Sequence, residues 1–285
     1  MYLTTDVTAR HSCHLSAKNL GTGNVMFQIA SVYGIAKRIG RIGNFDTIKE
    51  YCDHIRKEFG VNHGDTLYRN CRADSSIYEL LIYDGVLEKT FNNELFTWIR
   101  NNSKVNIRIW GHLECPLYFN QYRSEILDLF SPDQDSQLYI NTKYPELGSR
   151  NCVSIHIRMG IDSNTKCDYV YYQRAIDYIN KNVDDPLYLI FSDGSPDIGQ
   201  LTMPSYRVVD SNPDYIDLWT MSQCLHNIIN YSTFSWWGAY LNTNDKKIIT
   251  YPRSTVKYIS SKNSMSEDLI RDTYFISGVQ IEDTE

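Results

Sequence analysis

The sequence predicts an α/β protein whose C-terminal half is a doubly wound parallel sheet. Segments with the apolar alternation of strands, or with short apolar runs, take turns with segments that repeat apolar residues at helical spacing. Strands that alternate with helices in this way form parallel sheets with helices packed on both faces. The 285 residues, 42% of them hydrophobic, are enough for two domains of about 120–150 residues each.

The first half of the chain opens on a predicted amphipathic helix over residues 25–39. Its apolar side chains recur every three or four residues, Asn24 is the expected N-cap and Gly40 the expected end. The polar, turn-rich stretch 131–148 follows and indicates a domain boundary, so we expect domains 1–148 and 149–285. Other elements expected before this boundary are helices over 46–59 and 119–130 and a strand over 105–110.

The second half alternates more regularly. In a doubly wound sheet ligands bind outside the carboxyl ends of the strands, so residues that directly follow strands are the candidates for a binding site. The expected elements are strands over 153–157, 187–191, 206–209, 225–229 and 247–251, and helices over 171–182, 214–223 (capped by Asp214) and 234–241.

Composition narrows the class of protein. A net charge of −6 argues against a nucleic-acid partner, because such proteins usually carry a basic face. The seven cysteines form no Cys-x-x-Cys pair, which disfavours a zinc site and favours free thiols in a reducing compartment. No apolar run reaches the roughly 18 residues of a membrane span, and the N-terminus lacks the pattern of a signal peptide. We therefore expect no membrane segment and a cytoplasmic protein, with a removed anchor as the alternative.

The strongest chemical signal is the predicted strand that contains His156 and Arg158. Alternate residues of a strand share a face, so these two side chains point the same way, with Arg158 at the carboxyl end. A guanidinium matches phosphate oxygens as a planar fork, and Gly160 lets the chain turn just beyond it. The plainer alternative is a surface arginine after a strand that carries a hydrogen-bonded core histidine.

A second signal is the segment 230–239, which follows a short apolar strand and opens a helix. Ser232 or Thr233 can cap that helix, and the amide groups and positive dipole end of a helix start favour phosphate. The alternative is an ordinary serine or threonine cap before two core tryptophans.

Two shorter segments complete the candidate site. Ser192-Asp193-Gly194 follows a buried strand, and its carboxylate can accept hydrogen bonds from a guanine edge or a ribose hydroxyl. The alternative there is a simple turn. The Gly-Thr-Gly-Asn loop at 21–24 is neither a dinucleotide-binding pattern nor a P-loop, and its alternative is a helix cap after a tight turn.

Taken together, these segments resemble the α-1,2-fucosyltransferase family. The matches occur in the family's order and span residues 21–252, most of the chain; one such motif is weak evidence, but five in order are specific. They are residues 21–30 (Gly-Thr-Gly-Asn-Val-Met-Phe-Gln-Ile-Ala), 156–160 (His-Ile-Arg-Met-Gly), 171–176 (Tyr-Tyr-Gln-Arg-Ala-Ile), 191–193 (Phe-Ser-Asp) and 232–239 (Ser-Thr-Phe-Ser-Trp-Trp-Gly-Ala), with a weaker echo over 111–119.

The resemblance implies two Rossmann-like domains in a glycosyltransferase B-type arrangement. It implies that domain 149–285 binds GDP-fucose, that domain 1–148 is the acceptor side, and that transfer inverts the anomeric carbon without a metal or other cofactor. The implied acceptor is a galactose-like residue of an oligosaccharide or glycoconjugate, joined through an α-1,2 linkage. The chain departs from the family pattern at Met159, where a second arginine is usual, at Asp162, displaced by one position, and at Gly194, where a second aspartate is common.

Site roles follow from these arguments. Arg158 is expected to hold the pyrophosphate and His156 to orient the site, because departing phosphates need a fixed cation and amide donors. The general base is open between Asp162 and Glu114. The predicted catalytic residues are Arg158, His156 and Asp162, and the predicted donor-binding residues are Gly23, Asn24, Arg158, Ser192, Asp193, Ser232, Thr233, Phe234 and Ser235.

Three other functions compete with this interpretation. The departures at Met159 and Asp162 are compatible with a non-catalytic sugar-nucleotide or glycan-binding homologue. A fucosyltransferase with another linkage or a protein acceptor is the second alternative. A glycoside hydrolase is the third, but it needs two opposed carboxylates, and no such pair flanks the His-x-Arg strand.

Overall fold

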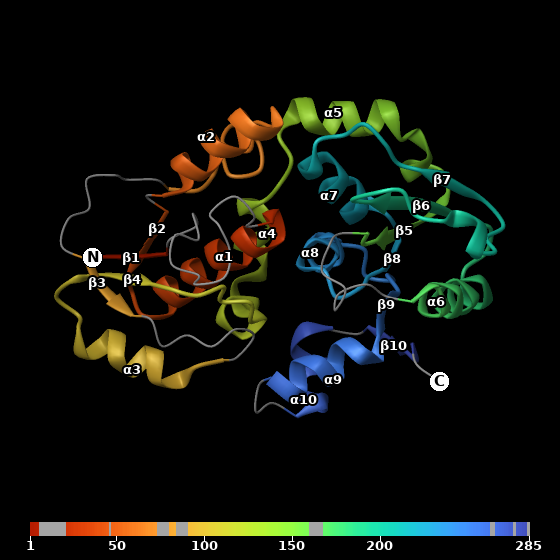
Figure 1. Ribbon diagram of the computed structural model, residues 1–285. Coiled ribbons are helices and arrows are strands. Elements are labelled where there is room, and N and C mark those ends of the chain that lie inside the picture. The colour runs from red at the N-terminus through yellow and green to blue at the C-terminus, as the bar shows by residue number, and fades with distance from the viewer. Residues whose placement is uncertain are drawn as a thin grey trace. The chain divides into compact units, whose positions relative to one another are not determined.

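Figure 1 shows a computed structural model of the protein, which describes residues 1–5, 21–45, 47–72, 80–83, 91–159, 168–262, 266–275 and 278–283. Contacts between Cα atoms divide the chain into two compact units, Met1–Pro132 and Asp133–Glu285. Each unit is built on its own sheet, and every strand pairing in both sheets is parallel. None of the described helices is both long and apolar enough to cross a bilayer.

The first unit has a sheet with the strand order β2-β1-β4-β3. Strands β1 and β4 are central, and their buried positions Leu3, Ile107 and Ile109 form the middle of the core. The strands are β1 (Tyr2–Thr5), β2 (Ile42–Asn44), β3 (Leu80–Tyr83) and β4 (Asn106–Ile109), and the α-helices are α1 (Thr22–Arg38), α2 (Ile48–Phe59), α3 (Asn93–Asn101) and α4 (Arg123–Leu129).

Helix α1 confirms the predicted amphipathic helix but starts earlier than expected. Its N-cap is Gly21, and the backbone N–H of Asn24 donates to the Gly21 carbonyl oxygen at 2.9 Å, so the prediction that Asn24 caps the helix is wrong. Thr22 and Gly23 already take up helical geometry, which moves Asn24 into the first turn. The predicted end is confirmed: Gly40 has φ of 70°, and the Arg41 N–H reaches the Ala36 carbonyl oxygen at 2.8 Å, as in a Schellman cap.

Gly34 lets helix α1 pack directly against backbone. A Cβ at this position would lie 2.3 Å from the carbonyl oxygen of Tyr118 and 2.7 Å from the Cα of Phe119. We expect Gly34→Ala to lower the free energy of unfolding by about 1–3 kcal/mol, because neither backbone can yield to an added methyl group. Thermal melting measures this loss. The control Gly43→Ala places its Cβ no closer than 3.4 Å to a neighbour, so an equal loss there would contradict the packing argument.

The second unit is the predicted doubly wound sheet, with strand order β10-β9-β8-β5-β6-β7. Its strands are β5 (Asn151–Ile157), β6 (Pro186–Ser192), β7 (Tyr206–Val208), β8 (His226–Ile228), β9 (Ile249–Pro252) and β10 (Val279–Ile281). Its α-helices are α5 (Gln134–Lys143), α6 (Tyr169–Asn182), α7 (Asp214–Gln223), α8 (Thr233–Leu241), α9 (Arg253–Lys262) and α10 (Glu267–Tyr274). Helix α7 has the predicted bounds, but its N-cap is Pro213 and Asp214 is already helical, so the capping role predicted for Asp214 is wrong.

The order of the strands reverses between β5 and β8. The chain adds β6 and β7 on one side of β5, then returns to place β8, β9 and β10 on the other side. Right-handed crossovers in opposite directions put their helices on opposite faces, and Figure 1 shows α6 on one face and α7 and α8 on the other. The carboxyl ends of β5 and β8 therefore form the switch point at which doubly wound sheets bind ligands.

Helix α5 moves the start of the second unit ahead of the boundary expected at 148/149. Arg207, on β7, hydrogen-bonds the Lys143 carbonyl oxygen at 3.0 Å and the Glu146 carboxylate at 2.7 Å. Gln137 of α5 donates to Gln223 at the end of α7 at 2.9 Å. Because α5 contacts the second unit through polar side chains, its sequence shows no apolar stripe at helical spacing. The segment therefore has the polar composition of a linker, which is why the boundary was predicted after it.

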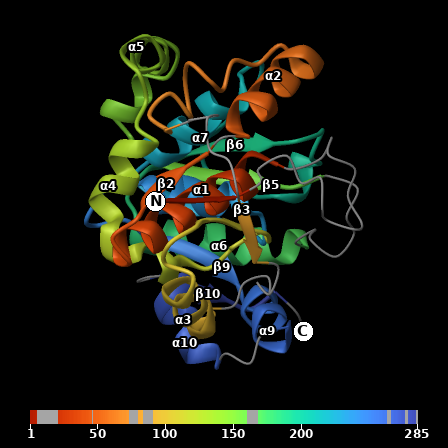
Figure 2. The same ribbon diagram turned by 90° about the vertical axis from the view of Figure 1, so that its left-hand side faces the viewer.

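Several elements were not predicted. In the first unit these are β1, β2, β3 and α3. In the second unit the strand predicted over 247–251 is not the last element, because α9, α10 and β10 follow it. Helices α9 and α10 pack together beside β9 and β10 (Figures 1 and 2). Strand β10 then extends the sheet beyond β9.

Candidate active site

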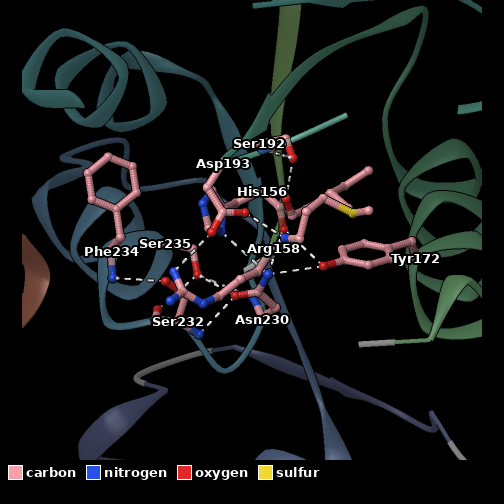
Figure 3. A network of polar contacts seen from close by, with 12 residues as sticks. His156, Arg158, Tyr172, Ser192, Asp193, Asn230, Ser232, Phe234 and Ser235 are labelled. Atoms are coloured by element: carbon pink, nitrogen blue, oxygen red, sulfur yellow. Dashed lines mark hydrogen bonds and ion pairs between the residues drawn. The ribbon is translucent and has the colours of Figure 1, made fainter. Parts of the chain in front are cut away.

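A network of polar side chains lies at the carboxyl ends of β5, β6 and β8 in the second unit (Figure 3). Four segments supply it: the end of β5, the end of β6, the loop from β8 into helix α8, and the start of helix α6. Parallel pairing in register carries these ends to one edge of the sheet. The residues labelled there are His156, Arg158, Tyr172, Ser192, Asp193, Asn230, Ser232, Phe234 and Ser235.

Asn230 is the centre of this network. Its Oδ1 accepts hydrogen bonds from the Ser232 N–H (2.8 Å) and the Ser235 hydroxyl (3.1 Å). Its Nδ2 donates to the His156 carbonyl oxygen at 2.8 Å and to the Tyr172 hydroxyl at 3.0 Å. A backbone N–H can only donate and a carbonyl oxygen can only accept, so the orientation of the amide is determined. Asn230 thereby ties the start of α8 to the end of β5.

His156 is buried beneath the site. Its Nδ1 lies 3.4 Å from Asn230 Nδ2, and its ring centroid is 5.6 Å from that of Phe234. Burial lowers the pKa of His156 to about 4, although the Asp193 carboxylate and the Asn230 hydrogen bond act in the opposite direction. The imidazole is therefore neutral at neutral pH, which suits the expected orienting role and not a cationic one.

The lowered pKa of His156 makes stability depend on pH. Below the usual value of about 6.5 the unfolded chain takes up a proton that the folded state refuses until about pH 4, so stability falls as the pH falls. From pH 7 to pH 5 this costs the wild type about 2 kcal/mol, a loss that His156→Gln should not show. Denaturant titrations of both proteins at the two pH values measure the difference. Parallel pH profiles would contradict the expectation.

Asp217 changes the pH dependence of stability in the opposite direction, so the wild type must be compared with His156→Gln at both pH values. Burial raises the pKa of Asp217 to about 7, so the folded state binds more protons than the unfolded state between about pH 4 and pH 7. Its contribution to stability is largest at low pH. Since Asp217 is the same in wild type and variant, its effect cancels in the difference.

Arg158 projects beyond the end of β5 and pairs with Asp193. Its Nη1 lies 3.4 Å from Asp193 Oδ2, and the other carboxylate oxygen accepts the Met159 N–H at 2.5 Å. The side chains of Arg158 and Asp193 are 37% and 35% exposed, so the guanidinium is oriented yet accessible to a ligand. Binding of guanine or ribose by Asp193 stays a prediction. The structure shows a further role for its carboxylate, which orients the Arg158 guanidinium.

Ser192 and Gly194 shape the adjoining end of β6. The Ser192 hydroxyl donates to the Ile157 carbonyl oxygen at 2.7 Å and accepts the Gly194 N–H at 3.3 Å, so it joins β6 to β5. A Cβ on Gly194 would lie 2.8 Å from the Met159 Cβ. The departures from the family pattern at 159 and 194 are thus neighbours. Donor binding by Ser192 stays a prediction.

Helix α8 starts at the same edge of the sheet. Ser232 is its N-cap, as the sequence allowed, with its hydroxyl accepting the Phe234 N–H at 3.3 Å. The Ser235 hydroxyl is buried, and its single hydrogen is shared between Asn230 Oδ1 and the Ser232 carbonyl oxygen, which lies 3.0 Å from Ser235 Oγ. Thr233 and Phe234 form the first turn, where the dipole and the amide groups favour an anion.

The structure groups most of the predicted site residues but not all. His156, Arg158, Ser192, Asp193 and the segment 232–235 lie together in the second unit. Gly23 and Asn24 belong to the first unit, in the first turn of α1. Asp162 and Gly160 lie outside the described residues. Within the described part of the chain, no group of three or more His, Cys, Asp or Glu is arranged to hold a metal ion.

Sequence reasoning singled out the segments that contain Asn230, Tyr171 and Tyr172 but gave these three residues no role in the site. The Tyr172 hydroxyl donates to the His156 carbonyl oxygen at 3.0 Å. The Tyr171 hydroxyl contacts the carbonyl oxygens of Ile229 and Thr250, the latter at 3.0 Å. Two adjacent tyrosines in the first turn of the helix that follows β5 were the available signal, since buried hydroxyls seek carbonyl partners.

Known proteins with similar sequences are glycosyltransferases. The sequence model described as glycosyl transferase family 11 matches residues 17–268. The O-antigen biosynthesis glycosyltransferase WbnK of Escherichia coli is 26% identical over 284 residues, covering 82% of this chain and 91% of that protein. An α-1,2-colitosyltransferase of Escherichia coli is 25% identical over 263 residues, covering 81% of this chain and 88% of the relative.

Solved structures are similar in fold. Fucosyltransferase NodZ from Bradyrhizobium superposes with a TM-score of 0.51 at 12% identity, covering 83% of this chain and 91% of that one. POFUT1 in complex with GDP-fucose gives a TM-score of 0.50 at 9% identity, covering 86% and 96%. These similarities agree with the predicted glycosyltransferase B-type architecture of two Rossmann-like units. With the family match over most of its length, the chain belongs to glycosyl transferase family 11.

Proposed function

We propose that the protein is an inverting fucosyltransferase that moves L-fucose from GDP-fucose to a hydroxyl group of an acceptor glycan, O2 of a galactose-like residue. The observation that carries this proposal is the position of Arg158 and of the amide-rich start of α8. Both lie at the switch point between β5 and β8, joined through Asp193, His156 and Asn230. A fixed cation and a helix N-terminus at one sheet edge suit a diphosphate.

The chemistry asked of this site is the departure of GDP. The acceptor oxygen forms a bond to the anomeric carbon while the bond from that carbon to the β-phosphate oxygen breaks, and its electron pair leaves with GDP. Negative charge grows on the departing oxygen. Arg158 and the first-turn amides of α8 would stabilise that charge more in the transition state than in the bound donor. The proposal therefore requires no metal ion, and we expect chelators to leave transfer unchanged.

The two units would bind different substrates. The second unit, with this site, would bind the nucleotide sugar, and the first unit would bind the acceptor. Similarity to an enzyme named for α-1,2 transfer supports the linkage, and the likeness in fold to fucosyltransferases supports the donor class. Gly23 and Asn24, in the first turn of α1, are proposed to contribute to donor binding from the first unit.

A related donor is the second candidate. One relative is named a colitosyltransferase, and colitose is L-fucose without the 3-hydroxyl group. The contact between Met159 and Gly194 puts an apolar group beside Arg158 and Asp193, where the family pattern has polar residues. A site that lacks a hydrogen-bond partner for the 3-hydroxyl would not discriminate against its absence.

A donor screen tests the proposal. Calorimetry with GDP-fucose, GDP-colitose, GDP-mannose and UDP-galactose, followed by transfer assays on several galactosides, should give tightest binding and transfer with GDP-fucose. Preference for GDP-colitose would favour the second candidate, a colitosyltransferase. Binding of GDP with no preference among sugars would remove the fucosyl assignment. Binding of GDP-fucose without GDP release in the presence of acceptors would favour a non-catalytic binding protein.

A further inference from the structure

Asn230 determines which ring nitrogen of His156 carries the proton. The amide of Asn230 is oriented by main-chain atoms, because Oδ1 accepts the Ser232 N–H and Nδ2 donates to the His156 carbonyl oxygen. Nδ2 also lies 3.4 Å from His156 Nδ1. An amide NH2 group can only donate, so a proton on Nδ1 would face another donor. The neutral imidazole therefore carries its proton on Nε2.

The Nε2–H group of His156 is a buried donor that the protein itself leaves available. His156 is 4% exposed, and within the described part of the chain no group accepts a hydrogen bond from Nε2. Buried polar groups nearly always have a partner, which is supplied by the protein, by water or by a ligand. A buried donor left available at the ligand-binding edge of a doubly wound sheet therefore indicates a contact with the ligand.

The imidazole lies beside both proposed contacts of the diphosphate (Figure 3). His156 is two residues before Arg158, and its ring centroid is 5.6 Å from that of Phe234 in the first turn of α8. The hydrogen-bond directions of the two ring nitrogens diverge, so Nε2–H points away from Asn230. A proton on both nitrogens would place a second cation next to Arg158, whose charge already opposes it.

We propose that His156 donates a hydrogen bond through Nε2–H to a phosphate oxygen of the GDP leaving group, and that Asn230 positions this donor by fixing the tautomer. The inference rests on the proposed function and deepens it. His156 is then a catalytic residue, which goes beyond the orienting role expected from the sequence, and Asn230 is a positioning residue.

No proton is transferred in this contact. As the bond between the anomeric carbon and the β-phosphate oxygen breaks, its electron pair leaves with GDP and negative charge grows on the phosphate. The hydrogen bond from the neutral imidazole strengthens as this charge grows. A neutral donor adds to the effect of Arg158 without repelling its guanidinium.

The first test reads the tautomer in the wild type by NMR. Two-bond proton–nitrogen correlation spectra of protein with isotope-labelled histidine distinguish protonated from unprotonated ring nitrogens, and His156→Gln assigns the signal by its loss. His226 is the internal reference, because its Nδ1 accepts the Ile248 N–H at 3.0 Å and is therefore unprotonated. We expect the same pattern for His156 at pH 7. A proton on Nδ1 of His156 would overturn the inference.

Addition of GDP tests the contact itself. We expect saturating GDP to shift the Nε2 resonance of His156 and to slow the exchange of its proton with solvent. His226 starts β8, at the end of the strand opposite the site, so its signals should stay unchanged. Unchanged His156 signals in protein saturated with GDP would show that Nε2–H contacts no phosphate.

Asn230→Asp tests the positioning role. The aspartate places a carboxylate oxygen where Nδ2 faces Nδ1, and this oxygen accepts a proton from Nδ1–H. We expect the spectrum of His156 to change to the tautomer with a proton on Nδ1, and the GDP-induced shift at Nε2 to disappear. An unchanged tautomer in the folded variant would show that Asn230 does not position the donor.

Kinetics separate donation from packing. The amide nitrogen of glutamine reaches about as far as Nε2 of histidine, whereas that of asparagine reaches only as far as Nδ1. We expect kcat to fall about 10²–10³-fold in His156→Asn, and His156→Gln to recover about tenfold of that loss. His226→Asn is the control at a second buried histidine and should keep kcat. Equal losses in both His156 variants would assign the ring a packing role only.

This inference and the proposed function fail in distinguishable ways. If the wild type binds GDP and transfers fucose but GDP leaves the His156 signals unchanged, the fucosyltransferase proposal stands and His156 is not a donor to the leaving group. If the wild type binds no GDP by calorimetry, the proposed function fails and the role of His156 fails with it.

Discussion

Arg158→Ala is expected to lower the rate of transfer by about 10²–10³-fold, the cost of losing one strong donor to a developing oxyanion. The guanidinium is held by Asp193 at the end of β5, beside the helix start that shares the proposed diphosphate. Its loss removes the fixed cation while the strand ends remain joined through Ser192. Steady-state kinetics should show the fall in kcat, and calorimetry should show weaker GDP binding.

Two further variants sharpen this result. Arg158→Lys should recover little activity, because a point charge cannot reproduce a planar fork on two oxygens. Arg150 precedes the same strand at its opposite end and pairs with Asp185 at 3.1 Å, so Arg150→Ala is a matched control that should keep full activity. A folded Arg158→Ala protein with normal transfer would refute the assignment of the diphosphate to this arginine.

Asn230→Asp is expected to weaken both the fold and donor binding. The change is nearly isosteric, but it replaces the Nδ2 that donates to the His156 carbonyl oxygen and the Tyr172 hydroxyl with an acceptor. The new carboxylate oxygen faces two oxygens that each lose a donated hydrogen bond, and it adds a buried charge, so we expect a loss of about 1–3 kcal/mol in the free energy of unfolding. Because Asn230 joins the start of α8 to β5, GDP affinity should fall together with the free energy of unfolding.

Denaturant titration and calorimetry with GDP test this expectation. Asn141 is the control: it is exposed on α5, and its side-chain oxygen accepts from Gln137, a role that aspartate keeps. Asn141→Asp should leave stability and GDP affinity unchanged. If Asn230→Asp were equally harmless, the network would not be what positions the helix start.

Much of the site was predictable because it rests on local patterns. The strand pattern predicted that His156 and Arg158 lie at the carboxyl end of β5, although the strand ends at Ile157 and Arg158 directly follows it. Ser232 caps α8 through a hydroxyl placed before a helical apolar run. The partnerships were not predictable. The pairing of Arg158 with Asp193 joins residues 35 positions apart (193 − 158), and Asn230 reaches His156 across 74 positions.

Errors in the predicted elements have the same origin. The cap of α1 shifted from Asn24 to Gly21 because glycine and threonine there adopt helical geometry without a side-chain signal. Helix α5 was taken for a linker because its contacts with the second unit are hydrogen bonds to Arg207 and Gln223. The short strand β2 has too few residues for a period to show, and its pairing with β1 defines it.

The sequence by itself determined the doubly wound second half, the family resemblance and the two segments proposed to bind the diphosphate, because periodicity and motif spacing are properties of neighbouring residues. Only the tertiary structure decided that β5 and β8 are adjacent and that Asn230 joins the start of α8 to the end of β5. Those features depend on strand order and on contacts between distant segments, which burial and hydrogen bonding settle once the chain has folded.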